Sequence, residues 1–150
     1  MDFVYDRVVV ALTTTVWDVL TNSEAMEPYL PGTAKVASTG ADSYRVSMKI
    51  SVGFLRPTVN TNVQLSEVNE LESFVIELSG KSMGAGVKGN AEVVLSALED
   101  DKDSTRVQMT GTVETSGLLK KVPESKIEAA AIGFLESYFA SVEQSFALSS

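Results

Sequence analysis

From residue 123 to residue 148, apolar side chains recur at spacings of three and four. This spacing places them on one face of a helix, so it predicts a single long amphipathic helix at the end of the chain. Such a face needs a broad apolar surface to pack against. The positions on the face are Ile127, Ala130, Ala131, Phe134, Leu135, Tyr138, Phe139, Val142 and Phe146.

Most of the preceding chain alternates between apolar and polar residues, which is the pattern of β-strands with one buried and one solvated face. Short polar segments separate the alternating stretches, at residues 39–42, 68–70 and 99–103. Connections this short join antiparallel neighbours, so we expect an antiparallel meander. The alternation predicts strands over 2–10, 44–54, 59–66, 73–79, 87–98 and 105–113.

Two short helices are expected between the first strand and the meander. The threonines at 13–15 offer side-chain oxygens to cap a helix that runs to Leu20. A second helix should start at Ser23 and stop before Pro31-Gly32. The elements together predict one α+β domain over residues 1–150, with a curved antiparallel sheet wrapped around the C-terminal helix. We expect the functional site in the space between the two.

Small residues occur on the predicted inward face of the last two strands and on the helix. Gly89, Ala91 and Gly111 share the phase of larger apolar residues, and Gly133 lies within the helix. Glycine inside a strand marks a bend or a close approach, and glycine inside a helix costs about 1 kcal/mol relative to alanine. Two interpretations stay open, close packing of helix on sheet or spare volume for an apolar ligand.

The composition limits the kinds of functional site and binding partner that the chain can have. Hydrophobic residues make up 44% of the 150 residues, with no run long enough to span a bilayer and no signal-peptide pattern at the start, so a cytoplasmic protein is expected. The chain has neither cysteine nor histidine, which removes thiol and imidazole nucleophiles, bases and metal ligands. Its net charge of −8 opposes binding of nucleic acid and of anionic membrane.

Three short motifs are interpreted as turns or loops. Residues 84–89 match G-x-G-x-x-G, but the alternation after them predicts a strand instead of the helix that a dinucleotide site requires. Gly80-Lys81-Ser82 resembles the end of a phosphate-binding loop without its earlier glycine, and a turn is expected. Asp100, Asp101 and Asp103 lack the glycine and glutamate of a calcium loop, so a solvated hairpin tip is expected.

Candidate catalytic carboxylates lie on the two short helices, at Asp18, Glu24 and Glu27. A carboxylate that faced the interior could act as an acid or base, but residues at such positions more often cap helices or face water. Trp17, the single tryptophan, is expected to anchor the first helix to the core. We therefore assign no catalytic residue, no metal ligand and no cofactor.

The order of elements resembles the helix-grip fold of the START-like (SRPBCC) superfamily, and within it the family of the carbon monoxide dehydrogenase G subunit. The similarity covers almost the whole chain and rests on ordered prolines, glycines and aromatic residues. The segments that carry it are Val16-Trp17-Asp18-Val19-Leu20, Leu30-Pro31-Gly32, Val52-Gly53, residues 84–95, residues 105–118 and Phe134-Leu135-Glu136-Ser137-Tyr138-Phe139.

This resemblance implies a non-catalytic accessory protein of a carbon monoxide dehydrogenase or a related molybdenum hydroxylase, which binds a hydrophobic molecule such as a quinone or lipid. Some relatives carry a C-terminal extension that contacts the membrane, whereas this chain stops soon after the helix. Together with the charge of −8, this implies that any membrane contact is indirect. Thr33 stands where many relatives have cysteine, so the resemblance implies no thiol-dependent function for this chain.

Alternation and helical phase predict which residues line the ligand cavity, and Tyr29 or Tyr138 could donate one orienting hydrogen bond. Two alternatives stay open. The interior could be filled by Phe54, Phe74 and Phe134, leaving the protein to act through its surface, or the protein could be a polyketide cyclase-like or hydrolase-like enzyme. The predicted ligand-binding residues are Met26, Tyr29, Leu30, Met48, Ile50, Val52, Phe54, Val63, Phe74, Ile76, Met109, Phe134 and Tyr138.

Overall fold

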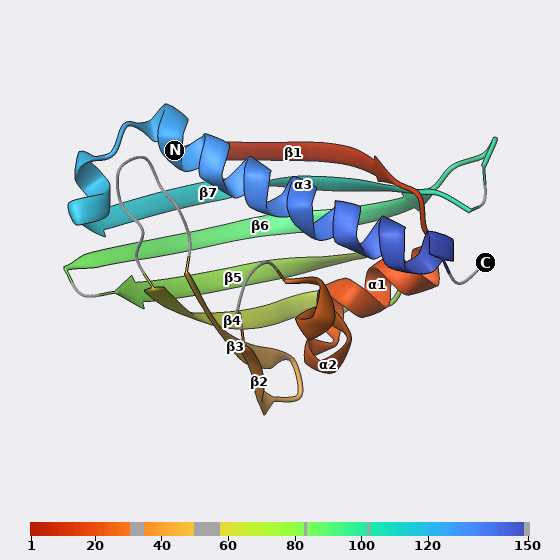
Figure 1. Ribbon diagram of the computed structural model, residues 1–150, viewed down its shortest axis with the longest axis horizontal. Coiled ribbons are helices and arrows are strands. Elements are labelled where there is room, and N and C mark those ends of the chain that lie inside the picture. Colours follow the sequence, from red (N-terminus) through yellow and green to blue (C-terminus); the bar gives the residue numbers. More distant parts are fainter. Residues whose placement is uncertain (31–34, 50–57, 83, 102, 149–150) are drawn as a thin grey trace.

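A computed structural model describes residues 1–30, 35–49, 58–82, 84–101 and 103–148, and for 146–148 the backbone alone. It shows a curved seven-stranded antiparallel sheet crossed by one long helix (Figure 1). The curved antiparallel sheet and the long helix confirm the predicted fold, and the strand at Lys35–Gly40 is additional to the six that were predicted. The strands are β1 (Asp2–Val9), β2 (Lys35–Gly40), β3 (Ser43–Lys49), β4 (Thr58–Asn69), β5 (Ser73–Ser82), β6 (Ala85–Ala97) and β7 (Thr105–Gly117). The helices are α1 (Thr13–Thr21), α2 (Ser23–Met26), η1 (Glu27–Tyr29), η2 (Leu118–Lys121) and α3 (Glu124–Leu148).

The strand order is β1-β7-β6-β5-β4-β3-β2, so β2 to β7 form the expected meander and β1 closes against the last strand. Every pairing is antiparallel. Phe74 lies opposite Val93, and Val93 lies opposite Met109. Successive side chains alternate between faces, so this register gathers the apolar positions of all these strands on the face beneath α3.

Most of the core lies on this inner face. Phe139 and Val142 of α3 are fully buried, and so are Val107 of β7 and Val16 of α1. Trp17 meets Phe74 edge to face with ring centroids 5.5 Å apart, which anchors α1 to the sheet as predicted. A second, smaller cluster of Leu119, Val122 and Ile127 holds the start of α3 against the far ends of β6 and β7.

Two local predictions are wrong. Gly80-Lys81-Ser82 does not form a turn, because β5 continues through Ser82 and pairs with β6 as far as Ala85. The threonines at 13–15 do not cap α1, since the N-cap residue is Leu12, which provides no side-chain bond, and the Thr13 hydroxyl meets that of Thr105 at 3.1 Å. The strand expected at 44–54 is seen as β3 up to Lys49, and its remainder lies outside the described residues.

The glycine-containing strand after Gly84 is confirmed. β6 begins at Ala85, directly after Gly84, so no helix follows the G-x-G-x-x-G match. Farther along the sheet, a Cβ added at Gly111 would lie 1.8 Å from the carbonyl oxygen of Asn90. The backbones of β6 and β7 therefore approach each other more closely at this point than a side chain allows, as expected for glycine within a strand.

Gly133 has a different environment. It is exposed on α3, and apart from its own helix backbone and its chain neighbours, no atom of the described residues lies within 4 Å of the place its Cβ would occupy. It therefore takes no part in close packing of the helix on the sheet. Replacing Gly133 with alanine should raise the free energy of unfolding by about 1 kcal/mol, because alanine loses less backbone entropy in a helix. Urea denaturation of the two proteins measures the difference, and Gly111→Ala is the matched control that should destabilise instead.

Candidate functional site

The inner face of the sheet is closed at one end and less tightly covered in the middle. Beside α1 the side chains of Phe74, Val93 and Leu95 are buried. Farther along the same strands, Ile76, Leu78 and Ala91 are only half-buried, although they share the inward phase. Solvent therefore reaches apolar residues that α3 would cover if the interior were fully packed.

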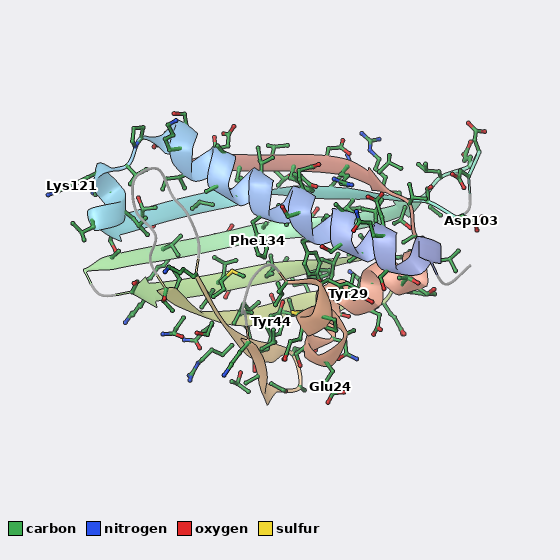
Figure 2. The ribbon with its side chains drawn as sticks, in the orientation of Figure 1. Glu24, Tyr29, Tyr44, Asp103, Lys121 and Phe134 are labelled. Carbon is green, nitrogen blue, oxygen red and sulfur yellow. The ribbon has the colours of Figure 1, made fainter. Side chains whose placement is uncertain are left out.

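The facing side of α3 shows the same incomplete cover. Ala131, Phe134 and Leu135 are half-buried, whereas Tyr138 and Phe139 one turn later are buried. The rings of Phe134 and Tyr138 stack with centroids 6.3 Å apart. Figure 2 labels Phe134 on α3, Tyr29 on η1 and Tyr44 on β3. The half-buried residues of helix and sheet define what we call the interior site: Val46, Met48, Ile76, Leu78, Ala91, Val113, Ala131, Phe134 and Leu135.

The predicted ligand-binding residues divide into three groups. Met26, Val63, Phe74, Met109 and Tyr138 are buried members of the core. Tyr29, Leu30, Met48, Ile76 and Phe134 are half-buried. Ile50, Val52 and Phe54 lie outside the described residues. Three of the predicted residues, Met48, Ile76 and Phe134, therefore belong to the interior site, and their role as ligand contacts stays a prediction.

Tyr44, which the sequence interpretation used only as part of a strand, supplies a polar group to this region. It lies on β3 opposite Val63, faces inward and is 6% exposed. Within the described part of the chain its hydroxyl has no hydrogen-bond partner. Burial raises the pKa of Tyr44 to about 12, so the phenol stays protonated near neutral pH. The hydroxyl can therefore donate one hydrogen bond to an acceptor that enters the interior.

Tyr138 cannot play the donor role that the sequence suggested for it. Its hydroxyl already donates to the backbone carbonyl oxygen of Val19, which ties α3 to α1. Burial raises its pKa, and the phenols of Tyr44 and Tyr29 add to this effect, as does the carboxylate of Asp18. Tyr29, from η1, approaches the hydroxyl of Ser145 at 3.5 Å. Three tyrosines thus converge where η1, β3 and α3 meet.

An arginine on the inward face of β1 fastens α3 over the sheet. The Arg7 guanidinium donates to Glu136 and Glu143, two carboxylates seven positions apart on α3. Glu136 also accepts from the hydroxyl of Tyr5 at 2.7 Å, and Glu143 from the Val10 amide at 2.8 Å. The pKa of Tyr5 is raised by burial and by its bond to Glu136. This network occupies the β1 side of the helix, so the interior site lies toward β3 to β6.

The candidate carboxylates are not in the interior. Asp18, Glu24 and Glu27 are exposed, and Glu27 accepts from the Val36 amide at 3.3 Å. Asp101 accepts from the Asp103 amide and the Ser104 hydroxyl at the tip of the β6–β7 hairpin, which confirms that segment as a turn. Within the described ranges, no group of three acidic side chains is placed to hold a metal ion.

The opposite, outer face of the sheet carries a polar groove that the sequence interpretation missed. It has a volume of about 670 Å³, and a neighbouring pocket of about 480 Å³ shares Arg45, Asn62 and Ser79 with it. Polar residues on the solvated side of alternating strands are ordinary, so the pattern gave no signal that they line a hollow. The residues that border the groove are Thr39, Ser43, Arg45, Asn62, Gln64, Glu77, Ser79, Lys88, Gly89, Asn90, Thr112 and Glu114. Val63 and Leu78, whose side chains face inward, also border it.

Sequence comparison agrees with this architecture. The family model CoxG, which describes the G subunit of carbon monoxide dehydrogenase, matches residues 8–147, almost the whole chain. The chain belongs to the CoxG family. No curated protein sequence matches this CoxG-family chain significantly. Among its described residues, no helix is long and apolar enough to cross a membrane.

Solved structures share the fold of this CoxG-family protein at low sequence identity. A conserved protein from Geobacillus kaustophilus is 14% identical with a TM-score of 0.87, over 99% of this chain and 97% of that one. A START superfamily protein from Mycobacterium smegmatis is 16% identical with a TM-score of 0.72, over 99% of both chains. The Zhui aromatase/cyclase from Streptomyces sp. R1128 is 15% identical with a TM-score of 0.63, over 97% of this chain and 92% of that one. These likenesses establish the START-like helix-grip fold.

Proposed function

We propose that this protein binds an apolar small molecule, quinone-like or lipid-like, between α3 and the inner face of the sheet. The observation that carries the proposal is the pairing of incompletely covered apolar residues with the unpartnered hydroxyl of Tyr44, among the residues that the structure describes. An apolar ligand there would gain roughly 25 cal/mol for each Å² removed from water, before the costs of binding. One donor among apolar walls fixes the orientation of a ligand that carries a carbonyl or similar acceptor.

The protein partner that we propose is a carbon monoxide dehydrogenase or a related molybdenum hydroxylase, with this chain as an accessory protein. Membership of the CoxG family supports that choice. The chemistry of the interior supports binding without catalysis. Of the described titratable side chains, those that are not exposed are the four tyrosines, Arg7 and Glu143. Arg7 and Glu143 are already paired with each other. The tyrosines with raised pKa values stay protonated near neutral pH, so they are not available as general bases.

A surface-acting factor with a filled interior is the second candidate, because Phe74 and Phe139 fill the end of the interior beside α1. Native mass spectrometry of freshly purified protein, followed by organic extraction, separates the two candidates. A stoichiometric apolar adduct supports the carrier. A clean apo mass and no uptake of an added quinone would favour action through the surface.

Substitutions locate the ligand. Met48→Trp and Phe134→Trp should each fill the interior site and lower quinone affinity by about tenfold or more, because a bulky ring occupies the ligand volume. Tyr44→Phe removes the donor and should weaken binding about tenfold, as expected for one hydrogen bond in a partly desolvated site. Quenching of Trp17 fluorescence measures affinity for Tyr44→Phe, and calorimetric titration serves for the tryptophan variants.

The matched control is Tyr5→Phe, which removes a phenol hydroxyl on the β1 side of α3, outside the interior site, and should leave affinity unchanged. Unchanged affinity in both tryptophan variants would show that the ligand lies elsewhere. Turnover of a polyketide or ester that Glu27→Gln abolished would instead identify an enzyme.

A further inference from the structure

The pocket on the outer face of β3, β4 and β5 has an unusual lining for a protein of this charge. Its five residues are Arg45, Asn60, Asn62, Ser79 and Lys81. Two of them are cationic, three are neutral hydrogen-bonding side chains, and none is acidic. The chain as a whole carries 20 acidic and 12 basic residues. A hollow without a carboxylate therefore stands out as a local site of positive potential.

Strand register brings these five residues together. Arg45 lies opposite Asn62, and Asn62 lies opposite Ser79. Asn60 lies opposite Lys81, two residues along from that row. Arg45 and Lys81 are thus separated by one intervening strand and by two residues along it, or roughly 12 Å between their backbones. Both side chains are long enough to converge on one group held above Asn60 and Asn62.

Hydrogen bonding leaves the donors of this pocket available. Arg45 Nε donates to Asn62 Oδ1 at 3.1 Å, which orients both side chains. With its oxygen engaged, Asn62 keeps its NH₂ group as a donor. In the parts of the chain that the structure describes, neither Arg45 nor Lys81 forms a salt bridge. By contrast Lys88, in the adjoining groove, lies opposite Glu114.

We propose that this outer pocket, lined by Arg45, Asn60, Asn62, Ser79 and Lys81, binds a phosphate group. Phosphate oxygens accept several charge-assisted hydrogen bonds, and a guanidinium, an ammonium, amide NH₂ groups and a hydroxyl are the donors that suit them. With a volume of about 480 Å³, the pocket has room for a phosphate group together with part of the molecule that carries it. The phosphate site is independent of the interior site, because Tyr44 and Arg45 are adjacent on β3 and face opposite sides of the sheet.

The test is an NMR titration of backbone amides with glycerol 3-phosphate, at constant ionic strength maintained with chloride. Saturable shifts are expected at the five pocket residues. Arg45→Gln and Lys81→Gln should each weaken binding by up to about fivefold, the size expected for exposed charge pairs, and the double variant by about tenfold or more. Lys121→Gln, on η2, removes the same charge outside the pocket and should leave affinity unchanged.

The source of the phosphate is decided by a parallel flotation assay with phosphatidylcholine vesicles that do or do not contain phosphatidylglycerol. Shifts with glycerol 3-phosphate alone identify a soluble phosphate ester. Flotation that needs phosphatidylglycerol and fails in the double variant identifies a lipid headgroup. If neither the shifts nor the flotation were observed, or if Lys121→Gln lost as much affinity as the pocket variants, the phosphate site would be overturned. Tyr44→Phe should leave phosphate binding unchanged. Failure of the phosphate site can therefore be distinguished from failure of the interior ligand site.

Discussion

Replacing Phe139 with alanine is expected to lower the free energy of unfolding by about 3–5 kcal/mol. The ring is fully buried, stacks on Tyr5 with centroids 6.2 Å apart and meets Tyr138 edge to face at 5.5 Å. Truncation would leave a cavity between α3 and β1 that the surrounding strands cannot close. Such a loss is a large part of the stability of an ordinary domain. Urea denaturation followed by circular dichroism measures it.

Phe134→Ala is the matched control on the same helix. Phe134 is half-buried at the interior site, so its truncation should cost only about 1 kcal/mol of stability. The same change should lower the affinity for an apolar ligand, because it removes part of the wall of the interior site. We therefore expect Phe139→Ala to lower mainly the stability and Phe134→Ala to lower mainly the ligand affinity. Equal destabilisation by both changes would mean that the interior is packed throughout.

Stability should fall steeply as pH rises above 10. Burial raises the pKa of Tyr44 to about 12 from a usual value near 10, and the pKa values of Tyr5 and Tyr138 are raised as well. The stability linked to a raised tyrosine pKa in the folded state is fully present below pH 10, the usual pKa in the unfolded chain. This contribution is lost between pH 10 and 12, where the unfolded chain ionises and the folded chain does not. For Tyr44 alone the loss is about 3 kcal/mol.

Denaturation midpoints across this pH range, with the near-ultraviolet absorbance of phenolate, test the expectation. Native protein at pH 11 should keep Tyr5, Tyr44 and Tyr138 protonated. Tyr44→Phe should flatten part of the pH dependence while leaving the rest. Ionisation of all the tyrosines near pH 10, with stability unaffected, would contradict the buried positions of these rings.

Patterns that repeat along the chain predicted the fold well. Alternation in β4 to β7 and the three-and-four spacing in α3 each reflect one buried face, which the sheet and helix then share. Local signals were less reliable. Gly80 suggested a turn, but it lies within a strand pair, opposite Val87 and Thr61, and tertiary pairing overrode the local preference. The cap expected at the threonines failed for a similar reason, since Thr13 meets Thr105 across the core.

The site was less predictable because it depends on contacts between distant segments. Arg7 stands in the apolar phase of β1 with Phe3, Tyr5 and Val9, and this was a visible sign that a carboxylate would approach this face of the strand. Its partners at Glu136 and Glu143 became evident only once α3 was placed over β1. Alternation also put Tyr44 inside, but it could not reveal whether the hydroxyl would find a partner. The hollow on the outer face arises from the shape of the sheet, which no periodicity encodes.

The pairing of β1 with β7 and α3 has a consequence for synthesis on the ribosome. Asp6 and its partner Arg106 are 100 residues apart, and Arg7 and Glu143 are 136 apart. β1 therefore leaves the ribosome many seconds before the segments that cover it, at a usual rate of about 5–20 residues per second. During that interval Phe3, Tyr5 and Val9 have neither β7 to pair with nor α3 to cover them. Nascent chains would be most exposed to aggregation, and to chaperone binding, until α3 has been made.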